Sequence, residues 1–288
     1  RYISVTGVQT CALPISEQVF FQNREDREMC VSRGLTHPGR SLVIPGSGVD
    51  LETFTPSPKP FPGPVTFLMF GRLIPKKGYD SYLRAAHALK LRYGPQCSFW
   101  VLGTADYDRP ESIALLERVM QAHSDGYIRY LQSTDDVLPI LRDVDAVVLP
   151  STYNEGVPRS LLESLACGKI VITTDWKGCR ETVQHGHNGY LVAPHNDESL
   201  QLTLSKVVDA SESTRAQMGR RSRQLAKERF DEKVVIDAYK KALGLERVSP
   251  LPAIRRPAVP ASTAVRGGNI RPFQPPPGKR RDAREQRL

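Results

Sequence analysis

The sequence predicts an α/β fold built on a doubly wound, mostly parallel, Rossmann-like sheet. Two observations carry this prediction. From residue 65 onward, short runs rich in Val, Ile and Leu alternate with segments that have the helical period. These runs are apolar throughout and do not alternate with polar residues, as expected for strands covered by helices on both faces.

The expected elements follow one another in regular order. Residues 16–35 read as a short strand, an Asn-containing turn and a polar helix, and residues 41–58 as a strand, a Gly-rich turn and a Pro-rich segment typical of an interdomain hinge. The strands expected after that segment are 65–71, 97–103, 127–132, 145–151, 169–175 and 189–194. The helices expected between and after them are 78–94, 111–124, 136–144, 158–168 and a final set over 198–243.

The charge of the chain is unevenly distributed. The net charge is +9, but residues 246–288 hold ten Lys and Arg against three Asp and Glu. That segment is rich in Pro and Arg with few large apolar residues, so we expect it to be a disordered tail. Because the rest of the chain is nearly neutral, we expect no nucleic-acid partner.

Other features exclude further classes of protein. No apolar run approaches the roughly 18 residues that a membrane-spanning helix needs. The five cysteines show no CxxC or other paired spacing, so we expect a reduced, cytoplasmic setting and no metal site. The basic segment 215–230 fits either contact with an acidic membrane surface or, more simply, a solvated helix face.

The loop after the first strand of the alternation carries two cations, Arg72 and Lys77, and leads into a helix. Ligands of open parallel sheets bind beyond the carboxyl ends of the strands, and cations at a helix N-terminus suit a phosphate or diphosphate. Two solvated surface cations are the simpler explanation. Neither GxGxxG nor a Walker A sequence is present, which argues against a dehydrogenase or a P-loop NTPase.

The loop after the fourth strand carries Glu155, and Glu163 lies in the helix that follows. A carboxylate can accept hydrogen bonds from two vicinal hydroxyls of a ribose or hexose. Gly156 would let the backbone approach a ligand closely. The alternatives are a favourable charge near a helix N-terminus for Glu155 and an exposed helix residue for Glu163.

Two other loops carry polar residues with weaker signals. Thr134, Asp135 and Asp136 fit helix capping better than ligand binding. Glu181 and His185 are expected on one helical face, with His187 nearby, and a structural role is favoured over a metal site. Trp176 is a candidate wall of the binding cleft.

Taken together, "GRLIPKKG", "EGVPRSLLESLACG" and "GCRETVQHGHNGYLV" resemble the group 1 glycosyltransferases, which are retaining enzymes of the GT-B fold. The order and spacing match over residues 19–243, with Glu155 and Glu163 forming the family's E-x7-E pattern. "NREDREM", "IPGSGVDLETF" and "ITTDWKGCRETV" are similar to transferases that extend lipid-linked saccharides from UDP-sugars.

The resemblance implies a role for each matching residue. Arg72 and Lys77 would bind the donor diphosphate and stabilise charge on the leaving group. Glu163 would hold the ribose hydroxyls, Glu155 would contact the donor sugar, and the backbone of Gly156, Val157 and Pro158 would approach the sugar and phosphate. No cofactor is implied, and the partners are a nucleotide-sugar and a saccharide or polyprenyl-diphosphate-linked acceptor, with contact at the inner membrane face as a further option.

A GT-B enzyme has two Rossmann-like halves, and the chain matches only the second half and the end of the first. We therefore expect an N-terminally truncated enzyme that retains some donor binding and does not transfer sugar. The expected parts are a non-native segment (1–16), the remnant of the N-terminal domain with the hinge (17–58), the donor-binding domain with its C-terminal helices (59–245) and the tail (246–288).

Three alternatives stay open at this stage. The chain could be a non-catalytic nucleotide- or sugar-binding fragment, or another GT-B enzyme such as a sugar epimerase or phosphorylase. A nucleic-acid binder acting through the basic tail has the least support, because the tail lacks interleaved aromatic residues.

The stretch "VTGVQTCALPI" (residues 5–15) shows no hydrophobic period and lacks the features of a secretory signal. A DNA string that would encode this peptide resembles a common sequencing-library adapter, so we expect the segment to be translated adapter. We predict that the locus, amplified from source DNA, lacks these codons upstream of Val19. Finding them in frame would contradict an adapter origin.

Overall fold

The computed structural model describes residues 15–57 and 63–245, and the expected non-native segment and tail lie almost wholly outside them. Most of the described residues form a six-stranded sheet in the order β5-β4-β3-β6-β7-β8, parallel at every pair. Its strands are β3 (Val65–Phe70), β4 (Cys97–Leu102), β5 (Arg129–Leu131), β6 (Ala146–Leu149), β7 (Ile170–Thr174) and β8 (Gly189–Val192). The predicted doubly wound parallel sheet is confirmed, and all six predicted strands are present.

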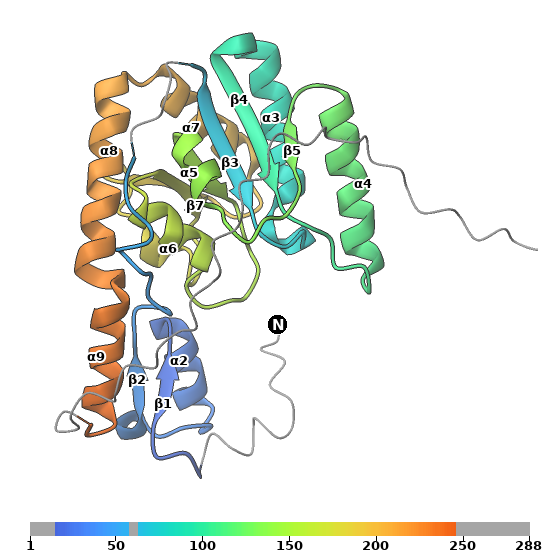
Figure 1. The fold of residues 1–288 in the computed structure, drawn as a ribbon. Coiled ribbons are helices and arrows are strands. Elements are labelled where there is room, and N and C mark those ends of the chain that lie inside the picture. The colour runs from blue at the N-terminus through green and yellow to red at the C-terminus, as the bar shows by residue number, and fades with distance from the viewer. Residues whose placement is uncertain (1–14, 58–62, 246–288) are drawn as a thin grey trace, which may run out of the picture. The chain divides into compact units, whose positions relative to one another are not determined.

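Helices cover the sheet on both faces, as Figure 1 shows. They are α3 (Tyr79–Tyr93), α4 (Pro110–Ser124), α5 (Leu138–Asp143), α6 (Arg159–Ala166), α7 (Asp197–Asp209), α8 (Glu212–Leu225) and α9 (Glu232–Ala242), with a π-helical turn at Ala226–Phe230 between the last two. Helix α3 packs against α7, and α6 packs against α8. Every residue of β3, β6 and β7 is buried, which explains their continuous apolar sequences.

Aromatic side chains join α3 to the two strands beside it. The rings of Phe67 and Phe99 stack with centroids 5.1 Å apart, and Tyr82 meets Phe99 edge-on. The buried Tyr82 hydroxyl donates to the carbonyls of Phe67 and Trp100 at 2.9 and 3.1 Å. Burial therefore raises the pKa of Tyr82 well above its ordinary value.

A smaller parallel pair precedes the main sheet. It contains β1 (Val19–Phe21) and β2 (Ser41–Val43), connected through α2 (Arg24–Ser32). The side chain of Asn23 caps α2 by accepting from the Asp26 amide at 2.8 Å, which confirms the predicted turn and polar helix. Figure 1 shows α9 running beside this pair, where Tyr239 packs on Phe20 with centroids 4.5 Å apart.

The basic helix α8 uses several of its arginines inside the protein. Arg223 donates to the carbonyls of Leu51, Phe54 and Ala166 at 3.0, 2.6 and 2.7 Å, and so fixes the hinge segment to the end of α6. Arg221 donates to the carbonyl of His187. These contacts account for part of the basic sequence without a membrane. Among residues 15–57 and 63–245, no helix combines the length and apolarity needed to span a bilayer.

Helix α3 offers a matched test of the packing. Leu89 is buried and Leu91 is 77% exposed on the same helix. We expect Leu89→Ala to lower the free energy of unfolding by about 2–5 kcal/mol, because it leaves a cavity in the core. Leu91→Ala should change it by less than about 0.5 kcal/mol. Urea denaturation of both variants measures the difference, and equal effects would contradict the placement of α3.

Candidate functional site

The strand order reverses between β3 and β6, and the loops after these two strands therefore meet at the carboxyl edge of the sheet. The first loop contains Arg72 and a 3₁₀ turn at Pro75–Lys77, and the second leads into α6. The amide of Thr152 donates to the carbonyl of Lys76 at 2.9 Å and connects the two loops directly.

Lys77 and Glu155 form an ion pair at this junction. The Lys77 Nζ lies 3.4 Å from both carboxylate oxygens of Glu155. The side chains are only 11% and 23% exposed, so solvent screens the pair less than it would at the surface. The structure thus brings together two predicted site residues that are 78 positions apart.

Arg72 and Glu163 line a separate cavity of about 520 Å³. Its wall also includes Phe54, Gly103 and Arg159, together with the loop 133–138 after β5. A Cβ at Gly103 would stand 2.1 Å from the carbonyl oxygen of Gly71, so only glycine fits there. The volume lies within the range of small-molecule sites, which is roughly 300–1,000 Å³.

Glu163 is held by Arg159 one helical turn earlier, at 2.9 Å. Burial raises the pKa of the Glu163 carboxyl, and the charge and hydrogen bond of Arg159 partly oppose that rise. The carboxylate therefore faces the cavity with a cation beside it. Sequence reasoning overlooked Arg159, although its i,i+4 spacing from Glu163 on a helix was a usable signal.

The loop after β5 forms local hydrogen bonds, but none of the three residues predicted to cap α5 is its N-cap, which is Val137. Asp136 Oδ1 accepts from the amide of Leu138 at 3.0 Å, and Thr134 Oγ1 accepts from the amide of Asp136 at 3.2 Å. These contacts form turns before α5, and the prediction that one of these residues caps the helix is wrong. The same residues also line the cavity with Arg72.

The prediction that Glu181 and His185 lie on one face of a helix is wrong. Only a 3₁₀ turn, Arg180–Thr182, forms there. Glu181 pairs with Arg229 at 3.1 Å, and His185 Nδ1 accepts from the amide of Leu191. Within the described ranges 15–57 and 63–245, no group of three or more His, Cys, Asp or Glu residues is arranged to hold a metal ion.

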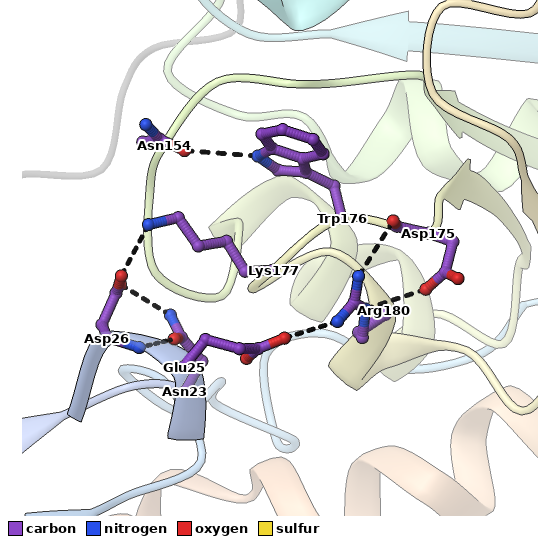
Figure 2. A network of polar contacts seen from close by, with 8 residues as sticks. All are labelled: Asn23, Glu25, Asp26, Asn154, Asp175, Trp176, Lys177 and Arg180. Atoms are coloured by element: carbon purple, nitrogen blue, oxygen red, sulfur yellow. Dashed lines mark hydrogen bonds and ion pairs between the residues drawn. The ribbon is translucent and has the colours of Figure 1, made fainter. Parts of the chain in front are cut away.

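A polar network connects the loop after β7 to α2 and to the loop after β6 (Figure 2). Lys177 Nζ lies 2.6 Å from Asp26 Oδ1, and Arg180 pairs with Glu25. Trp176 Nε1 donates to Asn154 Oδ1 at 3.3 Å. Trp176 thus joins two loops at the carboxyl edge of the sheet.

The parallel sheet with its flanking helices is a Rossmann-like domain that carries charged residues at its switch point. The chain belongs to the family described as "Glycosyl transferases group 1", whose sequence model matches residues 51–225.

Two of its curated relatives have names that specify lipid-linked sugars. The N,N'-diacetylbacillosaminyl-diphospho-undecaprenol alpha-1,3-N-acetylgalactosaminyltransferase of Campylobacter jejuni is 26% identical over 254 residues, covering 82% of this chain and 62% of that protein. The UDP-Gal:alpha-D-GlcNAc-diphosphoundecaprenol alpha-1,3-galactosyltransferase of Escherichia coli is 26% identical over 204 residues, covering 65% of this chain and 50% of that protein. The chain therefore spans between half and about three-fifths of the length of these two relatives.

Solved structures confirm the GT-B type of fold. Anabaena Alr3699/HepE in complex with UDP and glucose superposes with a TM-score of 0.67 at 20% identity, covering 80% of this chain and 63% of that one. A sucrose-phosphate synthase from Thermosynechococcus elongatus gives a TM-score of 0.68 at 21% identity, covering 83% of this chain and 60% of that one.

The Lys77–Glu155 pair should be energetically coupled. We expect Lys77→Met and Glu155→Gln each to destabilise the protein, because each leaves a partly buried charge without its partner. The double variant should lose less than the two single variants together, by about 0.5–3 kcal/mol in urea denaturation.

The exposed pair Arg84–Asp197 is the control for this double-mutant cycle. Its coupling in the cycle of Arg84→Met and Asp197→Asn should not exceed about 1 kcal/mol. Strict additivity of the Lys77 and Glu155 variants would show that the pair does not form.

Proposed function

We propose that the chain is the donor-binding part of a retaining glycosyltransferase. The enzyme would transfer a hexosyl or N-acetylhexosaminyl group from a UDP-sugar to a saccharide or polyprenyl-diphosphate-linked acceptor in polysaccharide or glycoconjugate synthesis. The observations that support this proposal are the Lys77–Glu155 pair at the switch point of the sheet and the cavity that Arg72 and Glu163 line, all inside the segment that matches the family.

The positions of these side chains suit a nucleoside diphosphate with a sugar attached. Glu163 would accept from the ribose hydroxyls in the cavity, with Arg159 balancing its charge. Arg72 and Lys77 would bind the diphosphate between the cavity and the Lys77–Glu155 pair. The sugar would then lie against Glu155 and the backbone of Gly156, Val157 and Pro158.

The chemistry proposed for these residues is electrostatic. When the bond between the sugar and the diphosphate breaks, negative charge develops on the leaving UDP. Arg72 and Lys77, both on the loop after β3, would stabilise that charge. Glu155 beside Lys77 keeps the cation in place when the site holds no donor. No protein nucleophile is assigned.

The nature of the acceptor bears on location. The names of both curated relatives contain an undecaprenol carrier. An acceptor of this kind lies in a membrane, so we propose that the enzyme works at the inner face of the cytoplasmic membrane. The exposed basic residues Arg220 and Lys227 would be available for contact with acidic lipid.

Isothermal titration of the 288-residue chain with UDP tests donor binding. We expect binding by the wild type and a roughly 10- to 100-fold weaker Kd for Arg72→Ala, since it removes a charge-assisted hydrogen bond to phosphate. Glu163→Ala should weaken binding through the lost ribose contact.

Arg118→Ala is the matched control, because Arg118 lies on α4 in an exposed pair with Asp80. It should bind UDP like the wild type. Failure of the wild type to bind, or equal losses in Arg72→Ala and Arg118→Ala, would reject the proposed site.

A further inference from the structure

One of the backbone amides proposed to donate a hydrogen bond to the sugar already has an acceptor within the protein. Of Gly156, Val157 and Pro158, only the first two have an amide N–H, because proline has none. The Val157 amide donates to Oε1 of Gln22 at 3.0 Å. A Cβ at Gly156 would stand 1.8 Å from the same Oε1, so the Gln22 side chain lies directly against this loop.

Gln22 is held in this place by the corner between β1 and α2. It directly precedes Asn23, the N-cap of α2. The first turn of α2 is fixed by the ion pairs Lys177–Asp26 and Arg180–Glu25 (Figure 2). Both side chains of the Lys177–Asp26 pair are about four-fifths buried, so the pair is a stronger constraint than an exposed one.

The loop after β7, which carries Lys177 and Arg180, also contacts the loop that contains Val157. A Cβ at Gly178 would stand 2.1 Å from the carbonyl oxygen of Gly156, and the φ of Gly178 is +77°. The two loops are therefore in backbone contact beside the Trp176–Asn154 hydrogen bond. The loop of Val157 is therefore in contact with the β1–α2 corner through Gln22 and with the loop after β7 through Gly178.

This contact should affect the binding of a UDP-sugar differently from the binding of UDP. The carboxamide oxygen of Gln22 is a neutral acceptor, like a sugar hydroxyl oxygen. An amide N–H with good geometry serves one strong acceptor, so a donor sugar that bonds to Val157 has to displace Gln22 Oε1. UDP alone ends at the diphosphate and leaves the contact intact.

From this we propose that Gln22 is a specificity-determining residue of the donor site. Its side chain competes with the sugar for the Val157 amide, so it opposes binding of the sugar part but not of the nucleotide part. The inference rests on the proposed function. It adds a residue from outside the family-matched segment 51–225.

Titration of the full chain and its Gln22→Ala variant with UDP, UDP-N-acetylglucosamine, UDP-N-acetylgalactosamine and UDP-galactose tests the proposal. In Gln22→Ala the Kd for UDP should stay within about twofold of the wild type. For at least one of the UDP-sugars, binding should tighten by roughly 2- to 12-fold, the usual range for one net hydrogen bond. A purely structural role of Gln22 would instead shift UDP and all UDP-sugars by the same factor.

Two further variants sharpen the test. Gln22→Glu keeps an oxygen acceptor for the Val157 amide, so it should not show the gain in affinity for the sugar. Gln121→Ala removes a glutamine that bonds Asp125 on the far helix α4, and it should match the wild type with every ligand.

The outcomes are distinguishable. UDP binding with an unchanged ratio between UDP and every UDP-sugar in Gln22→Ala would overturn the role of Gln22 and leave the proposed function standing. A gain equally present in Gln22→Glu would also overturn it. Absence of UDP binding by the wild-type chain would overturn the proposed function and this proposal with it.

Discussion

The reversal of strand order between β3 and β6 is the constraint on which the candidate site depends. On either side of that point the chain winds in opposite directions, so the following helices leave on opposite faces and the two loops meet with no helix between them. This topology brings Lys77 and Glu155 close in space. Their local sequences give no indication of the contact.

Several polar groups of the candidate site have partners within the protein. Lys77 neutralises Glu155, Arg159 neutralises Glu163, and the Val157 amide has Gln22. Partly buried charges and donors without partners are costly, so a protein that waits for an anionic ligand needs internal partners. The same pairing means that a ligand exchanges contacts and does not simply add them. Discrimination between ligands then depends on which internal contacts each one displaces.

Much of the fold could be predicted because its determinants are local. The apolar runs of the six strands, the Asn23 cap and the helical periods are all readable along the chain, and the structure reproduces them. The failure at Glu181 and His185 has a local cause as well. A spacing of four residues fits one face of a helix. The chain turns there instead, because the amide of His187 donates to the carbonyl of Gln184 and the amide of Gly186 donates to the carbonyl of Gly189.

Parts of the site could not be predicted, because they depend on long-range contacts. The resemblance to the family brought Arg72, Lys77, Glu155 and Glu163 together as a set, but it carried no information on how they pair. Gln22 lies 135 positions from Val157, and Asp26 lies 151 positions from Lys177. Nothing in the residues around either partner indicates these contacts, which follow only from how the β1–α2 corner docks.

The three carbonyls held by Arg223 set the limits within which this domain can be exchanged between enzymes. They come from the hinge segment and from the end of α6, while the guanidinium comes from α8, after the last strand of the sheet. A chimera that takes only the sheet and its crossover helices would leave these carbonyls without a donor and the hinge without an anchor. The unit that can be recombined therefore begins before Leu51 and includes α8. A boundary drawn at the end of β8, where the sheet itself is complete, would separate the Arg223 guanidinium from the carbonyls that it binds.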